Sequence, residues 1–253
     1  MNIVCIGAGR LAHQLMPELL LGGHVIMQIY NRTPWPAVLL SQKLHHAEHI
    51  EDLEKITRNA DVYFLAIADD AIAEIALKIN TLDVNGIIVH SSGVLPLEVL
   101  PSSNRGVFYP LQTFSDHHAV EWSSTPIMIT SDKEENQQKL HSLARTISSA
   151  VYTMSDTQKS YVHLSAVFSN NFTNHLLTLA EEICKAHQVP FEILKPLILT
   201  TFQKALHLGP SNSQTGPASR GDEVTISKHL QLLEQHPELR KVYEVITESI
   251  ITW

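Results

Sequence analysis

The sequence predicts an α/β protein: a domain built on a mostly parallel sheet, followed by an all-α domain. Short apolar segments alternate with amphipathic segments through the first half of the chain, which is typical of parallel strands joined by crossover helices. After about Ser155, strand-like segments cease and helical periodicity takes over. A glycine-rich turn directly follows the first apolar segment. We therefore expect a sheet domain at residues 1–155 and a helical domain at residues 156–253.

Several short segments of the first half have the apolar character of buried strands. They are residues 2–6, 24–30, 61–68, 86–90, 106–109, 126–130 and 150–154. Amphipathic helices are predicted between them at residues 10–21, 69–79 and 133–148. Pro17 lies inside the first of these helices, where its ring removes a hydrogen bond and favours a kink.

The second half is predicted to be helical. The expected helices are residues 157–187, 190–208, 222–235 and 237–251. Pro196 marks an early kink or restart of the second helix, and Pro237 separates the last two. A loop rich in Gly, Pro and Ser covers residues 209–221.

The order of strand, glycine turn and helix at the start of the chain matches a dinucleotide-binding fingerprint. Gly7 permits the tight turn, Gly9 lets the backbone approach a pyrophosphate, and Ala12 permits close contact between helix and sheet. The phosphates would rest on unpaired N–H groups at the helix N-terminus. The expected contacts are Gly7, Ala8, Gly9, Arg10 and Leu11. The alternative is a tight turn that binds no ligand.

The end of the second predicted strand favours NADP over NAD. An NAD site usually has Asp or Glu here, which accepts hydrogen bonds from the ribose 2′-hydroxyl. No acidic residue lies between Tyr30 and Ser41, and Arg32 lies in this stretch instead. A guanidinium can hold a 2′-phosphate through two charge-assisted hydrogen bonds, with Asn31 and Thr33 as further donors. Alternatively, Arg32 is an ordinary exposed cation.

Polar residues also follow later strands of the predicted sheet. Because ligands of open parallel sheets bind beyond the carboxyl ends of the strands, we expect Ala68, Asp69 and Ser91 to contact the cofactor as well. Ser91 and Ser92 could bond the nicotinamide carboxamide or a substrate. A plain turn with a helix cap explains the two serines equally well.

A polar face of the first long helix is the candidate catalytic site. Residues seven or eight apart return to nearly the same helix face, which aligns His163 with Asn170 and roughly with Asn171. Histidine suits proton transfer because its pKa lies near neutrality. His163 is therefore the predicted proton donor, helped by either asparagine. The alternative is a set of hydrogen-bonded polar groups where the helix packs on the sheet domain.

A second polar group of residues precedes the predicted helix at residues 222–235. Asp222 has the position of a helix N-cap. Arg220 either clamps an anionic substrate or pairs across a subunit contact, and the sequence leaves both readings open.

Composition argues against several kinds of partner. The formal net charge is −8 and no basic patch is interleaved with aromatics, so nucleic acid is not expected. We see no signal-like first segment and no apolar run of membrane-spanning length, so no membrane is expected. Cys5 and Cys184 form no disulfide framework, which favours reduced, buried thiols in a cytoplasmic protein.

The chain contains 15 histidines, which raises the question of a metal site. The clusters are His45, His46 and His49, and then His117 and His118. Neither cluster has the Cys or carboxylate spacing of a known zinc pattern, so no metal is expected.

Seven segments of the chain together carry a family resemblance. They are residues 7–9, 31–33, 61–69, 90–93, 109–114, 163–172 and 216–222. With these segments the chain resembles a bacterial family that pairs a Rossmann-like domain with a C-terminal helical domain of unknown function. Members of this family are usually described as NADP oxidoreductases. The resemblance extends over nearly the whole chain.

That family is related to the group of 6-phosphogluconate dehydrogenase, 3-hydroxyisobutyrate dehydrogenase and pyrroline-5-carboxylate reductase. The resemblance implies NADP at the positions above, a small-molecule substrate and a homodimer formed through the helical domain. Many hydroxyacid enzymes of the group carry a catalytic Lys on the first long helix. Here His163 occupies a comparable place and Lys159 lies a turn earlier, while Tyr109 replaces a histidine that often precedes Pro-Leu-Gln.

We therefore expect an NADP(H)-dependent oxidoreductase that transfers a hydride to or from a small carbonyl, hydroxyacid or imine. A function of another class is a non-catalytic sensor or regulatory protein that binds NADP(H), because the sequence shows no sure acid–base pair. A third reading is the use of a deazaflavin hydride donor, as in related sheet domains.

Overall fold

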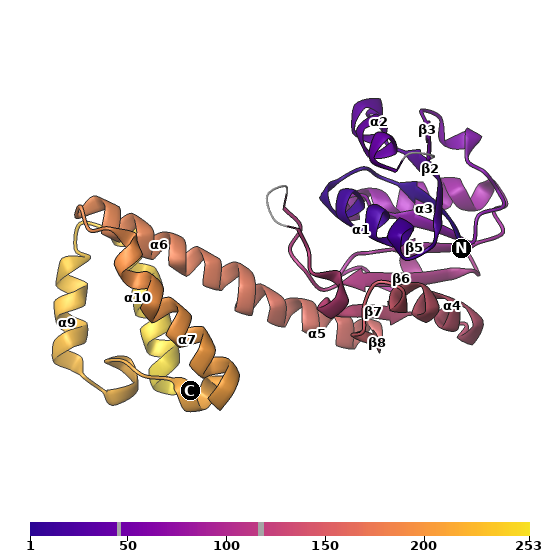
Figure 1. Cartoon of the computed structure of the whole chain (residues 1–253). Coiled ribbons are helices and arrows are strands. Elements are labelled where there is room, and N and C mark those ends of the chain that lie inside the picture. Colours follow the sequence, from indigo (N-terminus) through magenta and orange to yellow (C-terminus); the bar gives the residue numbers. More distant parts are fainter. Residues whose placement is uncertain (45–46, 116–118) are drawn as a thin grey trace. The chain divides into compact units, whose positions relative to one another are not determined.

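The computed structural model describes residues 1–44, 47–115 and 119–253 (Figure 1). The chain divides into two compact units, Met1–Phe168 and Ser169–Trp253. The sequence placed the division near Ser155, where strand signals end. The structure keeps helix α5 (Asp156–Ala166) in the first unit, because Lys159 on this helix is fully buried there.

The first unit is built on an eight-stranded sheet with the order β3-β2-β1-β4-β5-β6-β7-β8. Its strands are β1 Asn2–Ile6, β2 Val25–Tyr30, β3 Glu48–Ile50, β4 Val62–Leu65, β5 Ile87–His90, β6 Arg105–Pro110, β7 Ile127–Thr130 and β8 Val151–Thr153. Strands β1 to β6 are parallel, β7 is antiparallel to β6, and β8 is parallel to β7. The expected mostly parallel sheet is confirmed, and the short edge strand β3 was not predicted.

Helices cover both faces of this sheet. They are α1 Arg10–Leu21, α2 Pro34–Lys43, α3 Asp69–Thr81 and α4 Glu134–Arg145. Short 3-10 turns lie at η1 Leu53–Lys55, η2 Leu97–Val99 and η3 Trp122–Ser124. Helix α1 continues through Pro17, although the first helix was expected to kink there.

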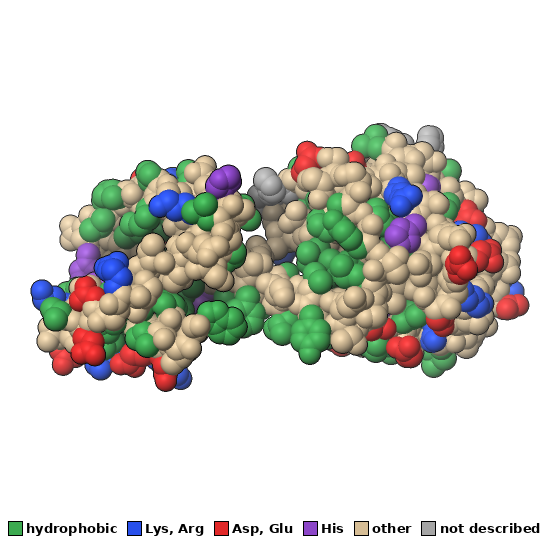
Figure 2. Space-filling model, turned by 90° about the horizontal axis from the view of Figure 1, so that it is seen from below, with side chains coloured by type: hydrophobic (Ala, Val, Ile, Leu, Met, Phe, Trp, Pro, Cys, Tyr) green, Lys and Arg blue, Asp and Glu red, His purple; other side chains and the backbone are tan. Residues whose placement is uncertain are grey.

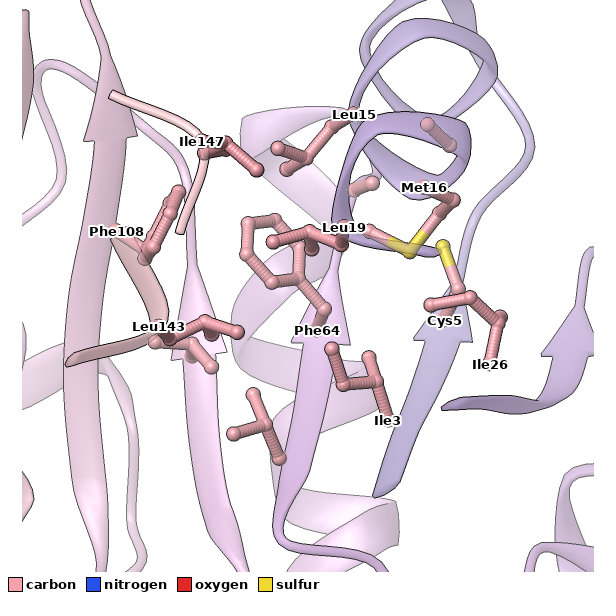
Figure 3. Close-up of a cluster of buried hydrophobic side chains, with 14 of the residues drawn as sticks. Ile3, Cys5, Leu15, Met16, Leu19, Ile26, Phe64, Phe108, Leu143 and Ile147 are labelled. Carbon is pink, nitrogen blue, oxygen red and sulfur yellow. The ribbon is translucent and has the colours of Figure 1, made fainter. Parts of the chain in front are cut away.

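Alternation along the strands produces two hydrophobic clusters. Ile3 and Cys5 of β1 point into a cluster with α1, α2 and α4, part of which Figure 3 shows around Phe64. Val4 and Ile6 belong to a second cluster, which includes the buried residues of α3. Successive strand residues point to opposite faces, so a sheet covered on both sides reads as a continuous apolar run.

The second unit contains helices that are joined by short turns. They are α6 Thr173–Ala186, α7 Lys195–Leu208, α8 Pro210–Ser213, α9 Glu223–Leu232 and α10 Pro237–Thr252, with 3-10 turns at η5 Phe191–Leu194 and η6 Ala218–Arg220. The helix expected at residues 157–187 is interrupted by a π-helix, η4 (Val167–Phe172). Asp222 is the N-cap of α9, as predicted, because its carboxylate accepts the backbone N–H of Thr225.

No residue from Ser169 to Trp253, all of which the structure describes, is buried. The first unit is different, because its strands and helices enclose many fully buried side chains. The helical unit therefore has no hydrophobic core of its own, even though its helices carry many large apolar side chains.

Within the described ranges, no three His, Cys, Asp or Glu residues are grouped so that they could hold a metal ion. His45, His46, His117 and His118 lie outside those ranges. No helix of the described chain has both the length and the apolar character needed to cross a membrane. Both cysteines are free, with Cys5 buried as expected and Cys184 only half-buried.

Candidate functional site

The candidate site lies at one edge of the parallel sheet in the first unit. Strands β1, β2, β4, β5 and β6 all end at this edge because they run in the same direction. Most of the residues that the sequence selected lie in the turns that follow these strands, and His163 reaches the same edge from α5. Ligands of open α/β sheets bind beyond this edge.

The two glycines of the first turn have different surroundings. Gly7 has a φ angle of +106°, and a Cβ there would collide with the backbone carbonyl of Ala66 at the end of β4. A Cβ on Gly9 would meet no atom of the described residues within 4 Å. Gly7 is therefore required by the fold itself. Gly9 faces open space, which fits the predicted approach of a pyrophosphate.

The N-terminus of α1 has the properties of an anion site. Gly9 is its N-cap, no described side chain caps the helix, and its first turn contains no acidic residue. The first N–H groups of a helix carry a partial positive charge and need acceptors. A pyrophosphate would satisfy both requirements.

Asn31 organises the adjacent turns. Its Oδ1 accepts the backbone N–H of Ala8 at 3.1 Å, and its Nδ2 donates to the carbonyl of Thr33 at 2.8 Å. The side chain therefore joins the turn after β1 to the turn after β2. Sequence reasoning treated Ala8 and Asn31 as separate cofactor contacts and missed this link between them.

Arg32 is exposed beside a second helix N-terminus. Helix α2 starts at Pro34 after the N-cap Thr33, with no side-chain cap and no acidic residue in its first turn. An exposed guanidinium and an uncapped helix N-terminus both attract anions. This local charge fits a 2′-phosphate better than a free 2′-hydroxyl.

The turns after β4 and β5 are joined by a hydrogen bond between side chains. Ser92 is buried, and its Oγ donates to Oδ2 of Asp69 at 2.8 Å. The same oxygen accepts the backbone N–H groups of Val94 and Leu95. Ser92 therefore builds the turn. Ser91 is half-buried, and its hydroxyl has no hydrogen-bond partner in the described chain, so it is the serine available to a ligand.

Helix α3 has a different N-terminus from α1 and α2. Ala68 is its N-cap, and Asp69 and Asp70 occupy its first turn. Their carboxylates offset the positive end of the helix, so it offers no site to a phosphate. Ala68 and Asp69 thus lie beside the site without forming a second anion pocket.

His90 at the end of β5 is a buried structural residue that sequence reasoning did not select. Its Nδ1 accepts the backbone N–H of Ser92 at 3.2 Å, which leaves Nε2 to donate to the carbonyl of Pro96 at 3.3 Å. Burial, followed by the positive charge of Lys159, lowers the pKa of His90 to about 4. The ring is therefore neutral at physiological pH.

Lys159 is not free to act on a substrate. Its side chain is fully buried, and Nζ donates to the carbonyl of Leu95 at 2.5 Å. Nζ also forms an ion pair with Oδ1 of Asp156 at 2.9 Å, and Oδ2 of Asp156 accepts the N–H of Leu97. These contacts tie α5 to the loop after β5. Lys159 therefore has a structural role in this chain.

His163 has a partner that the sequence did not reveal. Its Nδ1 lies 2.9 Å from the hydroxyl of Tyr109, the second-last residue of β6, and the two rings meet edge to face. A Cβ on Gly93 would lie 2.6 Å from Nδ1 of His163 and 2.9 Å from Cζ of Tyr109. In the described chain, Nε2 of the half-buried His163 ring has no partner. Three separate elements, β6, α5 and the turn after β5, therefore assemble this pair.

Asn170 and Asn171 belong to the second unit, where both are exposed. They lie in η4, the π-helix that separates α5 from α6. The spacing that aligned them with His163 assumed an uninterrupted α-helix, and a π-helix changes that spacing. Their part in catalysis stays a prediction, as does any role of the exposed Arg220.

Comparison with known proteins identifies relatives in both halves of the chain. Residues 125–250 match a family model described as "Domain of unknown function (DUF2520)", and residues 1–78 match one described as "Shikimate / quinate 5-dehydrogenase". No curated protein matches the chain.

Among solved structures, a Bacteroides fragilis protein described as a "putative NADP oxidoreductase" is 37% identical to this chain. The match covers 100% of this chain and 98% of that chain, with a TM-score of 0.90.

More distant structures share the fold. An imine reductase from Myxococcus stipitatus in complex with NADP+ is 14% identical, with 100% of this chain and 92% of that chain covered and a TM-score of 0.70. A pyrroline-5-carboxylate reductase from Coxiella burnetii is also 14% identical, with 99% and 96% covered and a TM-score of 0.60. The predicted Rossmann-like sheet with a C-terminal helical domain is confirmed.

Proposed function

Because the chain belongs to the family of the Bacteroides fragilis protein, we propose that it is an NADP(H)-dependent oxidoreductase. Its substrate is a small carbonyl, hydroxyacid or imine. The observation that carries the proposal joins two features at one edge of the sheet: the acid-free N-terminus of α1, which no described side chain caps, and a ring nitrogen of His163 that has no partner among the described residues. An oxidoreductase of this kind needs both features, one to bind the cofactor and one to deliver a proton.

The cofactor would extend along the edge of the sheet. The N–H groups that follow Gly9, with Arg10 and Leu11, would hold the pyrophosphate. Arg32 would hold the 2′-phosphate, and Ser91 beside Asp69 would contact the nicotinamide carboxamide. The open space above Gly9 and the absence of acidic residues in the first turns of α1 and α2 support this placement.

The bound cofactor supplies the hydride, and the chain supplies binding, orientation and the proton. When a carbonyl carbon gains the hydride, its oxygen becomes negative and takes a proton. We assign that proton to His163.

We also propose a homodimer formed through the helical unit. Large apolar side chains of this unit are exposed, among them Leu197, Leu206 and Leu232 at 64%, 88% and 75%. Figure 2 shows hydrophobic side chains on the surface of this unit. Apolar area of this extent is normally covered in a stable protein, and a second copy would cover it.

The two free cysteines favour a reducing compartment such as the cytoplasm.

The test is deuteride transfer from NADPH that carries two deuterium atoms at C4 of the nicotinamide, with a panel of small ketones, aldehydes and cyclic imines. We expect one deuterium per product molecule, detected by mass spectrometry, and a large loss in His163→Gln with NADPH binding retained. If tightly bound NADPH keeps its deuterium across the whole panel, the alternative of a non-catalytic NADP(H) sensor is favoured instead.

A further inference from the structure

We propose that Tyr109 is the positioning residue of the proton donor: its hydroxyl donates to Nδ1 of His163 and thereby fixes the ring proton on Nε2. The inference rests on the proposed function for its catalytic meaning. The hydrogen bond itself does not depend on that function.

The arrangement of the pair is set by the fold. Tyr109 is held in β6 by pairing with β7 on one side, and His163 is held on α5, one turn after the buried Lys159. Gly93 closes the third side, since no Cβ would fit between it and the two rings. The ring centroids are 6.0 Å apart with an interplanar angle of 64°. The absence of a side chain at Gly93 therefore lets both rings lie close to the turn after β5.

The direction of the hydrogen bond follows from acidity. A phenol, with an ordinary pKa of about 10, is a better donor than the N–H of a neutral imidazole. An imidazole nitrogen, whose conjugate acid has a pKa of about 6.5, is a better acceptor than a phenol oxygen. Burial, followed by the negative charge of Asp69, raises the pKa of Tyr109, so the phenol keeps its proton. The stronger donor therefore faces the stronger acceptor.

The tautomer determines which atom of His163 can act. With Nδ1 accepting, the one N–H of the neutral ring is on Nε2, the nitrogen without a partner in the described chain. This N–H can donate to a carbonyl oxygen or an imine nitrogen. As the substrate carbon gains a hydride from NADPH, the oxygen takes the proton from Nε2. Solvent returns a proton to Nε2, while the Tyr109 hydroxyl keeps its own proton and continues to donate to Nδ1. In a Ser-His-Asp triad, replacing the group that holds the correct histidine tautomer lowers turnover about 10⁴-fold.

The experiment is nitrogen NMR of the full chain labelled with ¹⁵N-histidine, without substrate, at neutral pH. The resonances of His163 are assigned by their loss in His163→Gln. In the unsubstituted chain we expect the proton of the neutral ring on Nε2. In Tyr109→Phe, which keeps the aromatic ring, we expect the Nδ1–H tautomer to appear.

Tyr161→Phe is the matched control, because it removes the phenol oxygen of an exposed tyrosine on the same helix. It should leave the tautomer of His163 unchanged. A proton on Nδ1 in the unsubstituted chain, or an unchanged tautomer in Tyr109→Phe, overturns the proposal. If Tyr109→Phe does not fold, the tautomer of the unsubstituted chain decides the question alone. Because no turnover is measured, failure of the oxidoreductase proposal would be seen separately, in the deuteride assay.

Discussion

Gly93→Ala tests whether the pair of Tyr109 and His163 is as closely packed as the structure shows. The new Cβ would lie 2.6 Å from Nδ1 of His163 and 2.9 Å from Cζ of Tyr109, whereas ordinary contacts start near 3.4 Å. At least one ring must therefore move by several tenths of an ångström, and the 2.9 Å hydrogen bond between them lengthens or breaks. Inserting a methyl group into such a packed site costs about 1–3 kcal/mol of stability.

Gly9→Ala is the contrasting variant. A Cβ on Gly9 has no neighbour within 4 Å, and its φ of −83° is open to alanine. Loss of stability should stay below about 1 kcal/mol, the usual size of an N-cap change. Binding of NADPH should weaken at least tenfold, since the methyl group would project toward the pyrophosphate.

Urea denaturation and NADPH titration of the two variants are measured together. We expect Gly93→Ala to lose stability and the Tyr109–His163 hydrogen bond while it still binds NADPH. Gly9→Ala should keep its stability and the Tyr109–His163 hydrogen bond but bind NADPH more weakly. The reasoning is refuted if Gly93→Ala is as stable as the unsubstituted chain with its His163 tautomer unchanged, or if Gly9→Ala binds NADPH normally.

Three further predictions concern protonation, the buried ion pair and assembly. The pKa of His90 is about 4 in the folded protein, whereas its ordinary value is about 6.5. As the pH falls, His90 is therefore protonated in the unfolded state before it is protonated in the folded state. The free energy of unfolding should fall by up to about 3 kcal/mol as the pH drops from 6.5 to 4, and should level off below pH 4. In His90→Gln, urea denaturation should show a smaller fall of this free energy over the same pH range. Lys159→Met leaves the partly exposed Asp156 carboxylate without its cation and should cost about 3 kcal/mol by urea denaturation, whereas Lys139→Met, from an exposed pair with Glu135, should change little. Sedimentation velocity should show a dimer that Leu206→Asp dissociates and that Leu21→Asp, an equally exposed leucine of the sheet unit, leaves intact; a monomeric unsubstituted chain would contradict the proposed assembly.

The sequence was most informative where the structure is local. The glycine turn is contiguous in sequence with its flanking strand and helix, so the pattern predicts the geometry. The lack of an acidic residue near Arg32 can likewise be read from one short stretch of sequence. The N-cap at Asp222 is equally local. The short edge strand β3 was missed because three residues show too little alternation to be recognised.

The candidate site was only partly predictable because its hydrogen bonds join distant segments. His163 was selected from its helix, but Tyr109 lies 54 residues earlier and the contact depends on the register of β6 against β5. The bond between Ser92 and Asp69 likewise joins two turns that only the sheet order brings together. The π-helix at Val167–Phe172 has no sequence signal that we could read, so the alignment with Asn170 used the wrong spacing rule.

Side-by-side titration of the full chain with NADPH and NADH tests the central claim most directly. Each charge-assisted hydrogen bond from Arg32 to a 2′-phosphate is worth about 1.5–3 kcal/mol, so NADPH should bind about 10-fold to 100-fold more tightly than NADH. Arg32→Ala should remove that preference. Arg58→Ala, an exposed arginine that precedes β4 and so lies near the opposite edge of the sheet, should keep it. Binding of neither nucleotide would contradict the account, and equal binding of both would contradict the role of Arg32.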